Sequence, residues 1–274
     1  MTTDPTTYDL AGPEDAPPLV FLHAASYTRK VWLPQTRALR QDFRVLALDL
    51  PAHGALADRP FTFAAAVREV AQVLHDVLPG RRALLVGTSL GGCVAMQFAA
   101  AHPGRVAGLV LSGCTFDARG LLCRLVLTGE GIVFPRGAQS FTRALHRDLH
   151  RRFPDLADEI IAAGTYWHGA AQAVRAMRRV DFRSALARYP GPALILNGRH
   201  DRVHRSSEAA FAGAAQNARV LTIARAGHIA SLDQPGAFTD AVRYFASQVF
   251  AAVPSCSPRI GGRGVILKGN PTHA

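Results

Sequence analysis

Cysteine is scarce in this chain of 274 residues. The four cysteines form no CxxC pair and show no spacing typical of a disulfide framework, which argues against a small disulfide-stabilised domain. We therefore expect reduced thiols in a cytoplasmic protein. The chain also lacks a P-loop and a GxGxxG motif, so nothing predicts nucleotide binding. We expect neither a metal nor an organic cofactor.

Long apolar runs are absent as well. The best candidate, residues 121–134, is shorter than the about 20 residues that a transmembrane helix needs, and it contains Arg124 and Glu130. The first 18 residues have neither a basic start nor an apolar stretch, and we expect no secretory signal. These features predict a protein without a membrane partner.

Lysine is nearly absent, although the formal net charge is +11. Of the 31 basic residues all but two are arginines, and no block of like charge exceeds three residues. The excess is largest in residues 117–188, where 12 arginines outnumber 7 acidic residues by 5. A scattered, arginine-rich surface is the simpler interpretation, and we predict no nucleic-acid partner. A basic binding surface is the alternative.

Short apolar runs alternate with amphipathic segments along most of the chain. The predicted strands are residues 17–23, 43–50, 82–87, 106–113, 192–198 and 218–224. Between these strands lie segments whose apolar residues recur at helical spacing, such as residues 61–78. Strands that alternate with helices and are continuously apolar predict an α/β protein with a doubly wound, mostly parallel sheet, buried on both faces.

This alternation stops between residues 117 and 186, which are basic and have helical spacing. We predict a core formed by residues 1–116 and 187–250, with 117–186 as a helical insertion. Residues 251–274 are rich in glycine, proline and serine and show no periodicity. We expect them to form a loosely ordered tail.

A cluster of small residues surrounds Ser89 in the stretch VGTSLGG. Gly87 to Gly91 match the G-x-S-x-G pattern, which predicts a nucleophile when it follows a strand and opens a helix. The apolar run before it and the helical spacing after it meet both conditions. The sharp turn raises the serine oxygen above the sheet, near a helix N-terminus that stabilises negative charge. We predict that Ser89 is a nucleophile; a glycine-rich turn with a capping serine is the alternative.

A serine hydroxyl needs a general base, and the base needs a carboxylate that orients it. His228 and Asp201 each follow one of the last two predicted strands. Doubly wound sheets place their sites at such carboxyl ends, and the chain order serine, aspartate, histidine is the expected one. His200 is the rival base, but it adjoins Asp201 and neighbours in sequence rarely face each other. Asp117 is the rival acid.

The oxyanion of an acyl-transfer reaction needs two preorganised donors. We predict that the backbone N–H of Leu90, directly after the nucleophile, is one of them. The other should come from the loop after the first long apolar strand, which reads HAAS over residues 23–26. We select the Ala25 N–H.

Five stretches together resemble the α/β-hydrolase fold superfamily, from about residue 6 to residue 250. They are LVFLHAAS, LDLPAHG, VGTSLGG, LNGRHD and AGHIASLDQP. The resemblance implies an α/β-hydrolase fold, a triad of Ser89, Asp201 and His228, and a helical cap formed by residues 117–186. It does not specify a substrate. Such proteins usually carry His-Gly in the oxyanion loop, whereas Ala24 adds a methyl group here.

The insertion supplies candidate substrate contacts. Leu121, Leu122 and Leu125 recur at helical spacing; they either pack the cap on the body or form an apolar ceiling over the substrate. Arg124 and Arg178 are candidates for binding a substrate carboxylate.

Two other polar patterns are given structural roles. The segment HRDLH, residues 146–150, has two histidines at helical spacing but lacks the glutamate of a metalloprotease motif. Asp49 and His53 in DLPAHG are interpreted as loop and turn residues.

The sequence thus predicts a serine hydrolase that cleaves a carboxylic ester, lactone or thioester of a small, partly apolar molecule through an acyl-enzyme. One alternative keeps the triad for carbon–carbon bond hydrolysis, elimination or perhydrolysis. A related lyase of menaquinone synthesis carries arginine where this chain has Cys93, which argues against that lyase. A non-catalytic ligand-binding protein of the same fold is the third hypothesis.

Overall fold

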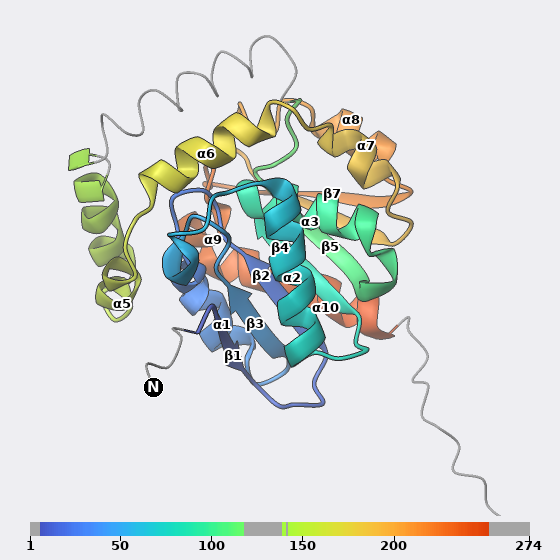
Figure 1. Ribbon diagram of the computed structural model, residues 1–274, viewed down its shortest axis with the longest axis horizontal. Coiled ribbons are helices and arrows are strands. Elements are labelled where there is room, and N and C mark those ends of the chain that lie inside the picture. The colour runs from blue at the N-terminus through green and yellow to red at the C-terminus, as the bar shows by residue number, and fades with distance from the viewer. Residues whose placement is uncertain (1–5, 118–138, 141, 252–274) are drawn as a thin grey trace, which may run out of the picture.

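A seven-stranded sheet forms the centre of the protein. The structure, a computed structural model, describes residues 6–117, 139–140 and 142–251 (Figure 1). The strands are β1 (Tyr8–Ala11), β2 (Pro18–Leu22), β3 (Arg44–Leu48), β4 (Ala83–Thr88), β5 (Val106–Ser112), β6 (Pro192–Gly198) and β7 (Asn217–Ile223). Their order is β1-β3-β2-β4-β5-β6-β7, and every neighbouring pair is parallel except β1 with β3.

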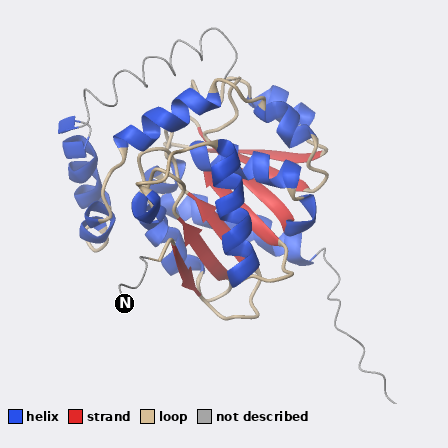
Figure 2. Ribbon diagram, in the orientation of Figure 1, coloured by secondary structure: helices blue, strands red, loops and turns tan. Residues whose placement is uncertain are grey.

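Helices surround this sheet (Figure 2). The α-helices with defined bounds are α1 (Leu33–Leu39), α2 (Phe63–Val77), α3 (Leu90–Ala101), α5 (Ala157–Ala162), α6 (Trp167–Met177), α7 (Phe182–Ala187), α8 (Glu208–Ala214), α9 (Ala230–Asp233) and α10 (Pro235–Ala251). The 3-10 helices are η1 (Arg29–Trp32), η2 (Gly54–Leu56) and η3 (Pro103–Arg105). Residues 142–152 are also helical. None of the described helices has both the length and the hydropathy needed to cross a bilayer.

The two faces of the sheet bury separate apolar clusters. In β2, Val20 and Leu22 join the cluster that includes side chains of α2 and α3, whereas Leu19 and Phe21 join the cluster of α1 and α10. This alternation follows from the two-residue period of a strand. Each such fully buried side chain stabilises the fold by about 1.5–3 kcal/mol. The doubly wound, mostly parallel sheet predicted from the sequence is confirmed.

The last strand departs from the prediction of burial on both faces. In β7, Val220 and Leu221 each remain 46% exposed. The reason is position, because β7 forms the edge of the sheet and pairs on one side with β6 alone. Of the expected tail, residues 251–274, Ala251 is the last residue of α10 and residues 252–274 lie outside the described residues.

The described part of the insertion is helical, apart from turns and one bridge residue. Figure 1 shows α6 running across the end of the sheet near the start of α3. A backbone bridge connects Tyr166, just before α6, with Ser26 after β2. This end of the sheet carries the candidate site.

Candidate active site

Ser89 occupies a strained turn between β4 and α3, with φ 53° and ψ −114°. Positive φ is uncommon outside glycine and costs about 1–3 kcal/mol. The Ser89 N–H donates to the Ser112 carbonyl of β5 at 2.7 Å. A Cβ at Gly91 would lie 2.0 Å from the Leu22 carbonyl oxygen, so only glycine allows α3 to approach β2 so closely. These contacts hold Ser89 at the carboxyl edge of the sheet.

Asp201 and His228 meet at the same edge, from the loops after β6 and β7. His228 Nδ1 lies 2.8 Å from Asp201 Oδ2. Burial alone would raise the pKa of Asp201, but hydrogen bonds from His204 and His228 outweigh it and hold the pKa below its usual range. An ionised carboxylate only accepts hydrogen bonds, so His228 Nδ1 carries the proton. His228 Nε2 is therefore left as the basic nitrogen.

A second histidine, His204, shares this carboxylate. Its Nδ1 lies 3.0 Å from Asp201 Oδ1, and its backbone N–H donates to the same oxygen at 3.1 Å. The His204 ring stacks on the His228 ring, with centroids 3.7 Å apart and planes at 29°. Desolvation lowers the pKa of His228 and repulsion from His204 lowers it further, against the opposing hydrogen bond to Asp201. His204 was not among the residues predicted from the sequence, although it lies only three residues after Asp201 in the chain.

One cavity of about 190 Å³ is lined by both Ser89 and His228. His204 and the turn of residues 24–26 also line it. The remaining wall is mostly apolar and consists of Tyr27, Phe116, Trp167, Val174, Met177 and Ile229. Among the described residues, no arginine, lysine, aspartate or glutamate lines this cavity. The arrangement suits an uncharged group placed beside the serine.

Two buried histidines form hydrogen bonds with the backbone of the turn of residues 24–26. His53 Nε2 accepts the Ser26 N–H at 3.2 Å, and His23 Nδ1 lies 2.8 Å from the Ala24 carbonyl oxygen. The other nitrogen of each ring bonds a backbone group. Desolvation lowers the pKa of His23 to about 4 and that of His53 to about 3. Both rings are therefore neutral at pH 7. The interpretation of His53 as a turn residue agrees with these contacts.

Two backbone donors remain available beside the cavity. Among the hydrogen bonds of the described residues, none uses the N–H of Ala25 or of Leu90. Leu90 begins α3, where N–H groups lack intrahelical acceptors. The positive φ of the turn falls on Ser26, at 67°, and not on Ala24. The methyl group that Ala24 adds to this loop therefore causes no left-handed strain.

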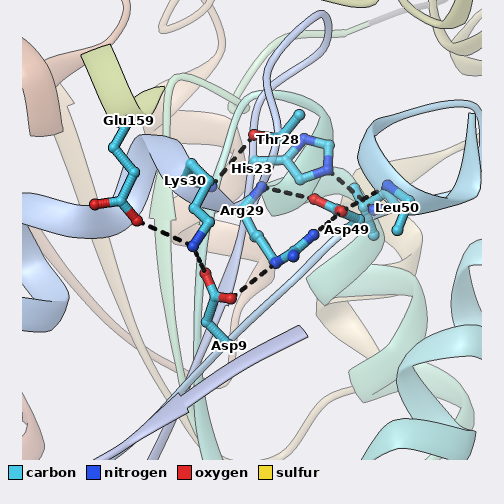
Figure 3. A network of polar contacts seen from close by, with 9 residues as sticks. Asp9, His23, Thr28, Arg29, Lys30, Asp49, Leu50 and Glu159 are labelled. Carbon is cyan, nitrogen blue, oxygen red and sulfur yellow. Dashed lines mark hydrogen bonds and ion pairs between the residues drawn. The ribbon is translucent and has the colours of Figure 1, made fainter. Parts of the chain in front are cut away.

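An ion-pair network follows this turn (Figure 3). Arg29 pairs with the fully buried Asp49 and, at 3.1 Å, with Asp9. Lys30 lies 3.0 Å from Asp9 and 3.1 Å from Glu159 of α5. The Arg29 N–H also donates to Asp49 at 2.8 Å. The network thus links the segment after β2 with the helical insertion.

The other residues selected from the sequence lie elsewhere. Arg178 caps the C-terminus of α6, half-buried, and does not line the cavity. His200 is exposed, and Asp117 borders a separate cavity of about 50 Å³. The remaining four lie outside the described residues: Leu121, Leu122, Arg124 and Leu125.

Asp201 and His228, together with His204, also have the composition of a metal site. The ligand atoms of Asp201, His204 and His228 all lie within 4.8 Å of one another. However, both Nδ1 atoms contact the carboxylate at 2.8–3.0 Å, which leaves no room for an ion between them. We interpret the group as a hydrogen-bonded cluster.

The mostly parallel sheet, with a serine at the tight turn between a central strand and a helix, defines the α/β-hydrolase fold. The pattern of the "Alpha/beta hydrolase family" matches residues 19–241. The chain belongs to this family, which confirms the resemblance inferred from the sequence.

Known relatives have several activities. The chain is 29% identical to a pimeloyl-[acyl-carrier protein] methyl ester esterase of Nitrosomonas europaea, over 82% of this chain and 93% of that protein. It is 31% identical to the 2-succinyl-6-hydroxy-2,4-cyclohexadiene-1-carboxylate synthase of an Enterobacter species, over 70% and 78%. The crystal structure of the enol-lactonase from Burkholderia xenovorans LB400 is 26% identical, with a TM-score of 0.72 over 88% of this chain and 95% of that one. The chain is accordingly an esterase-like enzyme.

Proposed function

We propose that this protein is a serine hydrolase that cleaves a small, partly apolar carboxylic ester, lactone or thioester through an acyl-enzyme. The observation that carries this proposal is the shared cavity, which is lined by Ser89 and by a His228 ring bonded to Asp201. The esterase and the enol-lactonase among the relatives support the same class of substrate.

The reaction follows from the roles of these groups. Ser89 Oγ attacks the acyl carbon while His228 Nε2 takes its proton. The Ala25 and Leu90 N–H groups bind the oxyanion. His228 then gives the proton to the leaving oxygen or sulfur, and the acyl group remains on Ser89. A water molecule, deprotonated by His228, releases the acid and restores the serine.

The lining of the cavity favours an uncharged acyl group. Its apolar wall includes Trp167, Val174 and Met177 from α6. A substrate carboxylate placed there would lose hydration without gaining a cationic partner from the described residues. We therefore expect simple apolar esters to be better substrates than acidic ones.

The test compares hydrolysis of p-nitrophenyl esters, from acetate to decanoate, by the wild type and by Ser89→Ala. We expect kcat to fall by at least about 10⁴-fold in the variant, because nucleophile and base act as a unit. Ser206→Ala, which removes an exposed serine, is the matched control and should keep wild-type activity.

A fluorophosphonate probe supplies a second measurement, because it should add one phosphonyl group to Ser89 and none to the variant. Equal turnover by wild type and Ser89→Ala would overturn the proposal. Absence of both turnover and labelling in the wild type would favour elimination chemistry or ligand binding instead.

A further inference from the structure

We propose that His204 is a positioning residue, which holds Asp201 and the His228 ring in their working orientation and opposes protonation of His228. The inference rests on the proposed function, because it assigns His228 as the base.

The first argument is the orientation of the carboxylate. His204 donates to Asp201 Oδ1 through both its ring and its backbone, while His228 uses Oδ2. Each carboxylate oxygen therefore has its own directed donor, and the group cannot rotate without breaking hydrogen bonds in a site where the Asp201 side chain is only 4% exposed. His204 itself is held edge-on by the Phe116 ring, with centroids 5.6 Å apart.

The second argument is the stack of the two imidazole rings. At 3.7 Å between centroids, charge on one ring strongly disfavours charge on the other in a partly desolvated site. This repulsion explains why His204 contributes to the lowered pKa of His228. A base that stays neutral in more acidic solution extends catalysis to lower pH.

The other titratable groups around His228 act differently. Asp201 and Asp233 of α9 favour its cationic form, and Asp233 is itself paired with Arg152 at 2.6 Å. Cys114, after β5, is a neutral thiol because burial raises its pKa. Thus, among the residues found to shift its pKa, His204 is the one that opposes a charge on His228.

Two substitutions separate the hydrogen bond from the ring. His204→Asn can keep a donor to Asp201 Oδ1 but loses the imidazole. His204→Phe keeps an aromatic ring against His228 but loses the donor. We expect both substitutions to shift the acid limb of the pH profile of kcat/KM to higher pH by about one unit. The reason is that neither new side chain can carry a charge that opposes protonation of His228. Only His204→Phe should also lower kcat, by about 10- to 100-fold, because Asp201 is then less well oriented.

The control is His200→Asn, which changes an exposed histidine on the same loop and should leave both kcat and the acid limb unchanged. A merely structural role for His204 predicts lower activity at every pH with an unmoved limb, and that result would overturn the proposal.

An NMR titration of the His228 ring nitrogens separates this test from the proposed function. It reads the protonation of His228 without turnover, and we expect its midpoint to rise in both His204 variants. An unchanged midpoint would overturn the role of His204 even if the esterase reaction is confirmed. A raised midpoint in an enzyme without ester turnover would keep that role while the proposed reaction fails.

Discussion

Two pairs of histidines lie beside the cavity, and they differ in almost every property except residue type. His23 and His53 are fully buried, with ring centroids 5.1 Å apart. The side chains of His204 and His228 are 16% and 31% exposed, and their centroids lie 3.7 Å apart. The first pair bonds backbone groups, whereas the second pair bonds the carboxylate of Asp201.

The difference shows that the partners of an imidazole decide what it can do. In the first pair, backbone groups occupy both nitrogens of each ring, and desolvation keeps the rings neutral. Such a ring can hold a turn but cannot exchange a proton with a ligand. In the second pair, Asp201 occupies His228 Nδ1, and the ring also borders the cavity. Such a ring can accept a proton there and remain stabilised by the carboxylate.

The largest effect that this comparison predicts is on activity. We expect His228→Gln to lower kcat for ester hydrolysis by at least about 10⁴-fold, because the base is lost. The free energy of unfolding should change by only about 1 kcal/mol, the net value of one hydrogen bond. Steady-state kinetics and urea denaturation measure the two quantities. A variant that unfolds readily but turns over normally would reverse the roles assigned to the two pairs.

Next in size is the response of stability to acid. The folded-state pKa values of His23 and His53 are about 4 and about 3, below the ordinary value of 6.5. Between these values and pH 6.5 the unfolded chain binds more protons, so the free energy of unfolding falls as pH decreases. At pH 5 each ring should lower the free energy of unfolding by about 2 kcal/mol relative to its value at pH 7.5.

Urea denaturation at pH 7.5 and pH 5.0 tests whether the free energy of unfolding falls as the pH decreases. His53→Gln should remove about half of the histidine contribution and flatten the dependence on pH. His200→Gln, which changes an exposed histidine, should not alter it. If the wild type were equally stable at both values, the two rings would not be held neutral in the folded state.

The contrast between the pairs also shows how far the sequence could lead. Continuous apolar runs revealed the strands, because burial on both faces leaves a direct pattern. The turn around Ser89 was readable because its small residues are adjacent in the chain. By contrast, the bond from Ser26 to His53 spans 27 residues, and the stack of His204 on His228 joins two loops. No local pattern encodes either contact.

The exposure of β7 has a similar explanation. Its residues have the composition of a buried strand, but exposure depends on the absence of a further neighbour at the sheet edge. Similarly, the cavity wall combines residues from α6 with Phe116 and Ile229, which are distant in sequence. Packing between elements, and with it the lining of the cavity, therefore required the structure.

The last comparison concerns the carboxylates of the network in Figure 3, and its exposed end gives the smallest predicted effect. At one end Asp49 is fully buried against Arg29, and at the other the Glu159 side chain is 47% exposed beside Lys30. We expect Glu159→Gln to change the free energy of unfolding by less than about 1 kcal/mol, since water and salt screen an exposed pair. Asp49→Asn should cost about 3–5 kcal/mol, because Arg29 would keep a partly buried charge without its partner.

Urea denaturation of both variants at low and high salt measures this difference. The Glu159 variant should lose its small effect as salt increases, whereas the Asp49 variant should not. Equal costs at the two ends would mean that the network acts as one unit, in which the insertion stabilises the turn of residues 24–26 through Lys30 and Arg29. Unequal costs would mean that burial decides how much each carboxylate of this network contributes to the free energy of unfolding.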